Sequence, residues 1–321
     1  MKIVGVLSAL AVIAICSCSG DGSLLPKSGG RPYEVLVVSV GSGRGAASVD
    51  SVLSLDVPGL PQSEPMFDVS LTDSAHFNQT AKLARSIVVV NVNPHLFTTT
   101  RIRYEKNVWA RPQIVAYVNA ASDSSLLADM PRIGTQLANL LVRAEMNAAI
   151  SQLGGSANVK ASGIVAEMFG YGIKIPSDMK SYKAGRNFVW LSDDAPSGMQ
   201  SICVYSYPGN RLDALRALAV RDSVMKANIP GERRGMYMQT AASTVVCGFT
   251  EEKGRTVMVS RGLWEMHGDA MGGPFVAHSV VDTAGNRVVV AEAFVYAPET
   301  KKRNLLRQAE AALYTLKKIK H

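Results

Sequence analysis

After residue 15 the sequence lacks any further apolar run long enough to cross a bilayer as a helix. Cysteine is also scarce, with four residues in a chain of 321. Cys16 and Cys18 lie at the end of the first apolar run, and Cys203 and Cys247 each lie in an apolar, strand-like run. A disulfide between Cys203 and Cys247 and two separate buried thiols are both compatible with this pattern.

Recognisable catalytic motifs are missing as well. The Gly-x-Ser-x-Gly motif of a nucleophile elbow is absent. So is the pair of histidines one helical turn apart that binds zinc. The net charge of +8 is spread in small clusters and forms no stripe within a nucleic-acid-binding module. These absences favour a protein that is not an enzyme, and we expect no metal, no cofactor and no nucleic-acid partner.

The N-terminus carries the most specific pattern in the chain. Lys2 precedes the almost wholly apolar residues 3–15, which is the layout of a secretory signal. The run ends in Ile15-Cys16-Ser17-Cys18, the pattern of a bacterial lipobox in which the last cysteine receives the lipid. We therefore predict a lipoprotein signal peptide over residues 1–17 and lipidation, with palmitate-type acyl chains, at Cys18. An ordinary cleaved signal peptide is the alternative.

The residues after Cys18 indicate where the protein is sorted. Ser19 stands where an aspartate would retain such a lipoprotein, and this favours transfer to the outer membrane. Residues 18–31 are rich in glycine and serine and predict a flexible tether with a root-mean-square length of roughly 20 Å. We expect a lipid-anchored protein on the periplasm-facing side of the outer membrane.

The remainder has the composition of a folded body, with 47% hydrophobic and 19% charged residues. Residue patterns predict strands at 33–40, 66–71, 86–92, 172–175, 188–191 and 202–207, hairpins at 101–118, 236–263 and 274–296, and helices at 46–55, 76–85, 159–169 and 211–225. Two longer amphipathic helices are predicted from apolar stripes. The first stripe consists of Ile133, Leu137, Leu140, Leu141, Ala144 and Ala148. The second consists of Leu305, Leu306, Ala309, Ala312, Leu313 and Leu316.

The two halves of the chain resemble each other. Each ends in a predicted hairpin and an amphipathic helix, and the two helices share Leu-Leu and Ala-Glu pairs at 140–145 and 305–310. Duplication and chance recurrence both explain this. We predict an α+β fold of two similar lobes, residues 32–155 and 156–321, each with antiparallel strands and a closing amphipathic helix. A cleft between such lobes would be the natural place for a ligand.

Two stretches have the composition of a binding site. Glycines at 41–46 follow a strand and could approach a pyrophosphate, but the short following helix and the lack of continuing βαβ alternation favour a plain glycine turn. Residues 261–275 form the densest polar and aromatic cluster, with one more histidine just beyond it.

The candidate ligand-binding residues of this cluster are Arg261, Trp264, His267, Asp269 and His278. Arg261 could pair with a carboxylate or phosphate, Trp264 could stack on a ring, and His267 with Asp269 could transfer protons. A glycine-rich loop whose tryptophan packs in the core and whose charges face water is the structural alternative.

Several short sequence segments together resemble one family. They are Leu24-Leu25-Pro26, Gly30-Arg31-Pro32-Tyr33-Glu34-Val35, Pro58-Gly59-Leu60-Pro61, Arg143-Ala144-Glu145-Met146-Asn147, Arg221-Asp222-Ser223-Val224-Met225-Lys226, Asn228-Ile229-Pro230-Gly231, Gly235-Met236-Tyr237-Met238, the stretch 261–275, Tyr296-Ala297-Pro298-Glu299 and Arg303-Asn304-Leu305. Over nearly the whole mature chain the sequence resembles an uncharacterised lipoprotein family of Gram-negative anaerobes, catalogued as domain of unknown function 4837. The resemblance implies an exported, lipid-anchored protein and no particular activity.

The anchor, the tether and the missing catalytic motifs favour a non-enzymatic envelope lipoprotein. We expect its partners to be the membrane, through the lipid, and an envelope protein or a small-molecule ligand. The alternative is an envelope-acting enzyme, a hydrolase, that uses the region from Arg261 to His278.

Overall fold

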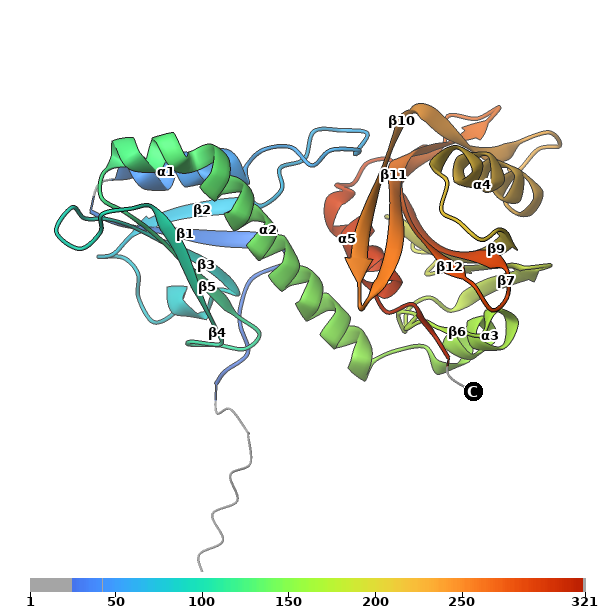
Figure 1. Cartoon of the computed structure of the whole chain (residues 1–321), viewed down its shortest axis with the longest axis horizontal. Coiled ribbons are helices and arrows are strands. Elements are labelled where there is room, and N and C mark those ends of the chain that lie inside the picture. Colours follow the sequence, from blue (N-terminus) through green and yellow to red (C-terminus); the bar gives the residue numbers. More distant parts are fainter. Residues whose placement is uncertain (1–24, 42, 320–321) are drawn as a thin grey trace, which may run out of the picture.

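The computed structural model describes residues 25–41 and 43–319, and it arranges them as two lobes joined by one long helix (Figure 1). The predicted signal peptide and Cys18 lie outside the described residues. Among the residues that the structure describes, no helix combines the length and the apolar character needed to span a membrane.

The first lobe is built on a five-stranded sheet in the order β2-β1-β3-β5-β4. Its strands are β1 (Glu34–Val40), β2 (Asp68–Asp73), β3 (Ser86–Val92), β4 (Arg101–Lys106) and β5 (Ile114–Ala120). All run parallel except β4, which pairs antiparallel with β5. The central strands are near-continuous runs of valine and isoleucine, as expected for parallel strands that are covered on both faces.

Two helices cover one face of this sheet. They are α1 (Gly43–Leu53) and α2 (Asp123–Gly155), and they share one apolar core with the sheet. The helices approach each other closely because Gly134 of α2 has no side chain: a Cβ there would lie 2.7 Å from Cγ1 of Val52. On the opposite face a smaller cluster packs Phe77 and Trp109 against Val38, Ile87 and Val115.

The second lobe is built on a seven-stranded antiparallel sheet in the order β10-β11-β12-β13-β9-β8-β7. Its strands are β7 (Ser181–Gly185), β8 (Phe188–Ser192), β9 (Met199–Pro208), β10 (Tyr237–Glu252), β11 (Arg255–His267), β12 (Gly272–Asp282) and β13 (Arg287–Tyr296). One face packs against α3 (Val159–Phe169) and α5 (Arg303–Leu313), and the other against α4 (Ala214–Asn228). Two short strands, β6 (Tyr171–Gly172) and β14 (Lys317–Lys318), pair with each other.

The α+β class is confirmed, and so are most predicted elements, including both amphipathic helices. The predicted helix at 76–85 is wrong, since the structure has only the 3-10 turn η1 (Ala81–Leu83) there. The side chain of Asp73 accepts hydrogen bonds from the backbone N–H groups of Ala75 and His76, and that of Asn78 accepts one from Ala81. Such side-chain bonds compete with a continuous helix.

The two lobes differ in sheet topology. The first sheet is mainly parallel, whereas the second is antiparallel throughout. The expectation of antiparallel strands in each lobe therefore holds for the second lobe, whereas in the first lobe only β4 and β5 pair antiparallel. One βαβ unit follows the glycines at 41–46, since α1 connects the parallel strands β1 and β2, but the alternation does not continue, because only the turn η1 lies between β2 and β3. Local residue patterns cannot distinguish a parallel from an antiparallel sheet, since the direction of a strand depends on the path of the connection that leads to it.

A disulfide between the two cysteines of the second lobe is excluded. Cys203 and Cys247 are both free. They lie on β9 and β10, and β13, β12 and β11 run between those strands in the sheet. Neighbouring strands lie about 4.8 Å apart, whereas a disulfide joins Cα atoms no more than about 7 Å apart.

Candidate functional site

The five candidate residues predicted from the sequence lie in three different environments. Arg261 of β11 and His278 of β12 project from the sheet face that α5 covers, and both contact a residue of α5. Trp264 is only 2% exposed and belongs to the core on the opposite face. His267 ends β11 and Asp269 lies in the turn that follows, and both are exposed. The fold thus brings Arg261 and His278 together and leaves the other three apart.

Trp264 has a structural role. Its indole Nε1–H donates to the backbone carbonyl of Val295 at 3.2 Å, and its ring packs edge-on against Phe294. The neighbouring Gly273 makes room for it, since a Cβ there would lie 3.1 Å from the indole nitrogen. His267 stacks on Tyr237 at the sheet edge.

Arg261 forms a two-pronged ion pair with Glu310 of α5. Its Nη1 donates to Oε2 of Glu310 at 3.2 Å, and Nη2 contacts the other carboxylate oxygen. Burial acts to raise the pKa of Glu310, but Arg261 and, more weakly, His278 outweigh it and hold that pKa at about 2. Glu310 is therefore a buried anion in the middle of this face.

His278 lies between two carboxylates without a hydrogen bond to either. Its Nδ1 is 3.7 Å from Oε1 of Glu252 and its Nε2 is 3.8 Å from Oε1 of Glu310. The ring is 1% exposed and packs edge-on against Tyr314 at a centroid distance of 4.7 Å. Tyr314 donates to Glu310 at 3.4 Å, and burial is the main reason why the pKa of its phenol is raised.

The first lobe reaches the same helix from the other side. The carboxylate of Glu64, in the connection between α1 and β2, accepts hydrogen bonds from the backbone N–H groups of Lys302 and Arg303 at 2.7 and 3.0 Å. One lobe thereby caps the N-terminus of a helix in the other, where unpaired N–H groups favour an anion. Arg303 also binds Asp68 of β2 at 2.6 Å, and Arg307 lies over the ring of Tyr33.

The space beside this cluster is small. The cavity bordered by Pro58, Leu60, Arg261, Arg303 and Arg307 measures about 30 Å³. That volume accommodates one or two water molecules and no organic substrate. Arg261, His278 and Glu310 therefore form a packed junction between the lobes rather than the lining of a walled pocket.

A much larger hollow lies on the first lobe, with a volume of about 1060 Å³. It is bordered by the starts of β1 and β2, by residues 27–31, by the connection between α1 and β2, and by residues 80–85. Its polar side chains are Lys27, Arg31, Glu34, Ser54, Asp56, Ser63, Asp68, Ser70, Thr80 and Arg85. The sequence showed no signal for this hollow because its lining comes from four separate segments with no local motif.

Several charges at the hollow are paired. Arg31 donates to Glu34 at 2.6 Å, and Arg85 binds the buried carboxylate of Glu145 through two nitrogens at 2.9 and 2.7 Å. Asp56 accepts from the hydroxyl of Ser63 at 2.8 Å. Lys27 lines the hollow with no ion-pair partner among the described residues. The lining thus presents positively and negatively charged side chains together with hydroxyl groups that can donate or accept hydrogen bonds.

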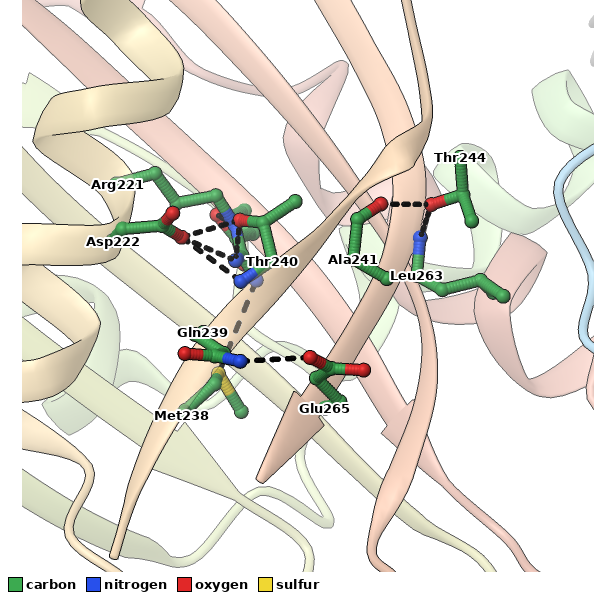
Figure 2. A network of polar contacts seen from close by, with 10 residues as sticks. Arg221, Asp222, Met238, Gln239, Thr240, Ala241, Thr244, Leu263 and Glu265 are labelled. Atoms are coloured by element: carbon green, nitrogen blue, oxygen red, sulfur yellow. Dashed lines mark hydrogen bonds and ion pairs between the residues drawn. The ribbon is translucent and has the colours of Figure 1, made fainter. Parts of the chain in front are cut away.

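A second buried ion pair lies on the opposite face of the seven-stranded sheet. Figure 2 shows its arginine, Arg221, beside Asp222 and Thr240. Arg221 of α4 binds Glu292 of β13 at 2.7 Å and donates to the hydroxyl of Thr240 at 2.7 Å. Its guanidinium lies 3.9 Å above the ring of Phe275. Asp222 accepts from both the N–H and the hydroxyl of Thr240. These partners leave the guanidinium no surface for a ligand, so the pair attaches α4 to the sheet.

Within residues 25–41 and 43–319, no three His, Cys, Asp or Glu side chains come together as a metal site. The arrangement defines a class of protein: a two-lobed α+β protein with a charged, packed junction and an open hollow on its first lobe. Residues 158–315 match the family described as domain of unknown function DUF4837. Residues 28–154 match a second family, described as domain of unknown function DUF8532. The DUF4837 match covers the second lobe and not nearly the whole mature chain.

No curated protein matches the chain. A crystal structure from Bacteroides thetaiotaomicron is similar over 47% of this chain and 46% of its own chain, with 14% sequence identity and a TM-score of 0.28. The match thus spans about half of that protein.

Proposed function

We propose that the protein is a lipid-anchored envelope protein that binds a ligand without converting it, and that the hollow on the first lobe is its binding site. The observation that carries this proposal is the size of the hollow. Its volume of about 1060 Å³ suits a small molecule, since ligand pockets measure roughly 300–1,000 Å³. The cavity at the Arg261 cluster, at about 30 Å³, does not.

The lining favours a polar ligand with both donors and acceptors. Lys27 offers a cation and Asp56 a carboxylate, and four hydroxyl side chains also line the hollow. Arg31 and Asp68 add further charges, which are already paired with Glu34 and Arg303. Apolar surface from Leu36 and Val69 completes the lining. A neutral or zwitterionic molecule with several hydroxyl or amide groups, such as a fragment of envelope glycan or peptide, matches this mixture better than a strongly charged one.

The position of the hollow connects it to the proposed anchor. Lys27 follows Cys18 by nine positions in the chain, and nine residues span at most about 30 Å. A lipid on Cys18 would therefore keep the hollow close to the membrane surface. This supports a ligand present at the periplasmic face of the outer membrane.

Catalysis by the region from Arg261 to His278 has less support. Arg261 and Glu310 are bound to each other, and both ring nitrogens of His278 are buried beside carboxylates. A hydrolase needs its acid and base within hydrogen-bond reach of a substrate, and this cluster has no space for one.

Substitutions in β2 test the proposed binding site. Ser70→Trp fills the hollow, whereas Leu71→Trp changes the next residue of the strand, which is 53% exposed and does not line it. The full chain is extracted from native membranes in each form and examined by native mass spectrometry for retained small molecules. We expect the same added mass on the wild type and Leu71→Trp, and its loss from Ser70→Trp. Equal retention by all three forms would show that the hollow is not the site.

The anchor is tested independently of the ligand. Cys18→Ala should abolish lipid labelling with a radioactive palmitate precursor and move the protein from the outer-membrane fraction to the soluble periplasmic fraction. Cys16→Ala is the control and should change neither. An unchanged distribution of Cys18→Ala would contradict the proposed location while leaving the proposed ligand site open.

A further inference from the structure

We propose that the groove between α4 and the free edge of β10 binds an extended, uncharged segment of a partner protein, which adds a strand to the seven-stranded sheet. This surface lies on the second lobe. The inference therefore does not depend on whether the hollow of the first lobe holds a ligand.

The first observation is a free strand edge. β10 is the outermost strand of its sheet and pairs with β11 from Tyr237 to Glu252. Near its start the other edge is covered, since Met238 donates to the carbonyl of Ile229. For residues 246–252 no backbone hydrogen bond to that outer edge occurs within the described part of the chain. These N–H and C=O groups are available to another strand.

A wide bulge bounds this free edge. Ala241 pairs with Leu263 and Val246 with Arg261, so four residues of β10 lie opposite the single residue Gly262. The hydroxyl of Thr244 donates to the carbonyl of Ala241 and accepts from the N–H of Leu263, which holds the bulge in place (Figure 2). The free segment beyond it has the length of an ordinary strand.

The second observation is that, beyond the bulge, this edge carries no charged residue before Glu251. Residues 237–250 contain no charged residue and no proline. Natural edge strands usually carry lysine, proline or inward-pointing charges that prevent contact with other chains. On β10 the first charges are Glu251 and Glu252, at the hairpin tip. The uncharged stretch from Val246 to Thr250 is therefore the part of the edge that is open to pairing with a partner.

The third observation is the inverted polarity of the neighbouring helix. α4 buries Arg221, which is 3% exposed, and leaves Leu215 83% exposed. Ala217 and Leu218 of this helix border a narrow cleft of about 20 Å³ together with Cys247 of β10. When a peptide adds a strand to a sheet edge, main-chain hydrogen bonds hold it and neighbouring pockets receive alternate side chains.

The side chains along the edge indicate the chemistry of the partner segment. Phe249 is 61% exposed and pairs with Met258, and Val246 is 72% exposed and pairs with Arg261. These two pairs lie on opposite faces of the sheet, because Val246 and Phe249 are three positions apart and successive side chains of a strand alternate between the faces. An added strand therefore meets apolar side chains on both faces. Uncharged, β-branched or apolar residues suit it best.

The position of the groove favours a protein segment over the membrane. α4 and β10 lie at the upper end of the second lobe in Figure 1, whereas the described chain begins at the lower end of the first lobe. A second copy of the chain fits less well than a single strand, because each copy would bring its own α4, packed on β10, against this one.

Cys247 provides a direct readout of the occupied groove. It lines the cleft and is half-buried, whereas Cys203 is fully buried. The full chain in nanodiscs is alkylated with iodoacetamide, and modification of Cys247 is followed by peptide mass spectrometry. The probe is an acetylated peptide with alternating threonine and valine and one terminal lysine. At a peptide concentration about ten times the Kd, alkylation should slow about tenfold, since only the free state reacts.

Matched variants localise the effect. Leu215→Lys and Phe249→Lys place a charge beside the groove and should remove the protection. Leu127→Lys, a change at an equally apolar helix position that is 63% exposed on α2, should keep it. A peptide N-methylated at every amide should not protect Cys247, because it cannot donate to the strand edge.

Four results would overturn the proposal. They are no protection by the unmethylated peptide, equal protection by the fully N-methylated peptide, slower alkylation at higher protein concentration without peptide, and slower alkylation on adding vesicles of phosphatidylethanolamine and cardiolipin. The third would identify a second copy of the chain as the occupant, and the fourth the membrane.

Discussion

At the scale of single residues, each face of the second lobe's sheet carries a buried glutamate that an arginine holds. Glu310 is held by Arg261 on the face that α5 covers, and Glu292 is held by Arg221 beneath α4. Each pair joins a helix to the sheet, so loss of either arginine leaves a buried carboxylate without its cation. Removing one partner of a buried ion pair lowers the free energy of unfolding far more than replacing both partners by apolar residues.

The pKa of Glu310 determines how the stability of this lobe depends on pH. Because folding lowers that pKa from 4.5 to about 2, the stabilisation is complete above pH 4.5 and is lost as the pH falls toward 2. We expect Glu310→Gln to lower the free energy of unfolding by about 2 kcal/mol at pH 7, a value reduced for the solvent exposure of Arg261. Urea unfolding at pH 7 and pH 3 measures this.

The control for that prediction is Glu167→Gln, at an exposed position of α3. It should change stability by less than about 0.5 kcal/mol at either pH. If the wild type and Glu310→Gln lost stability equally between pH 5 and pH 3, the acid sensitivity would come from other carboxylates.

A double-mutant cycle tests the pair beneath α4. Arg221→Met alone should cost about 3–5 kcal/mol, because it leaves the carboxylate of Glu292 fully buried without a cation. The double variant Arg221→Met and Glu292→Leu should recover most of that loss, since both charges are gone. Chemical denaturation of the four forms gives the coupling energy. Additive losses would mean that the two side chains act independently.

At the scale of elements, helix packing depends on where glycine removes a side chain. Gly134 lies where α2 meets Val52 of α1, and the added Cβ would come within 2.7 Å of that side chain. Gly163 lies within α3, and a Cβ there would meet nothing within 4 Å. The same substitution at these two positions therefore separates helix propensity from packing.

Gly134→Ala and Gly163→Ala should change stability in opposite directions. Alanine is favoured over glycine in a helix by about 1 kcal/mol, so Gly163→Ala should stabilise the protein by about that amount. At position 134 the clash with Val52 should exceed this gain and give a net loss of about 1–2 kcal/mol. Thermal unfolding of the three proteins measures both. Stabilisation by Gly134→Ala would show that α1 can move away from α2 at little cost.

At the scale of the whole molecule, α5 connects the two lobes. Its N-terminus is capped by Glu64 from the first lobe, its arginines reach Asp68 and Tyr33, and its next turn carries Glu310. A change in the docking of the lobes is therefore transmitted to the helix that packs on the second sheet. Neither lobe alone contains all partners of this helix.

Glu64→Gln tests that connection. The amide keeps an acceptor oxygen but loses the charge that favours the helix N-terminus, so the docking should weaken by about 1 kcal/mol. Hydrogen exchange should show faster exchange at the start of α5, with α3 unchanged. Glu105→Gln, an exposed change on β4, is the control. Unchanged exchange at α5 would mean that the remaining contacts hold the lobes together without this cap.

The candidate site was predictable only in part. The pattern at 261–278 indicated Arg261 and His278 as residues that could act together, and the structure brings them to one carboxylate. Glu310 was missed because it lies in an ordinary amphipathic helix, 49 residues from Arg261. Arg221 and Glu292 were missed because a charged residue in a helix or strand is usually exposed, and only packing shows that these two are not.

The sequence by itself determined the α+β class, most helices and strands and the family match of the second lobe, because these depend on local periodicity and on short motifs. It also predicts the lipid anchor, from one short motif. The tertiary structure alone decided that the first sheet is mainly parallel, that Trp264 belongs to the core, that the lobes meet at α5, and that an open hollow lies beside β2. These features depend on contacts between residues far apart in the chain, such as Glu64 with Lys302, 238 positions away. Local patterns carry no information about contacts between such distant residues, since burial and strand pairing depend on the path of the whole chain.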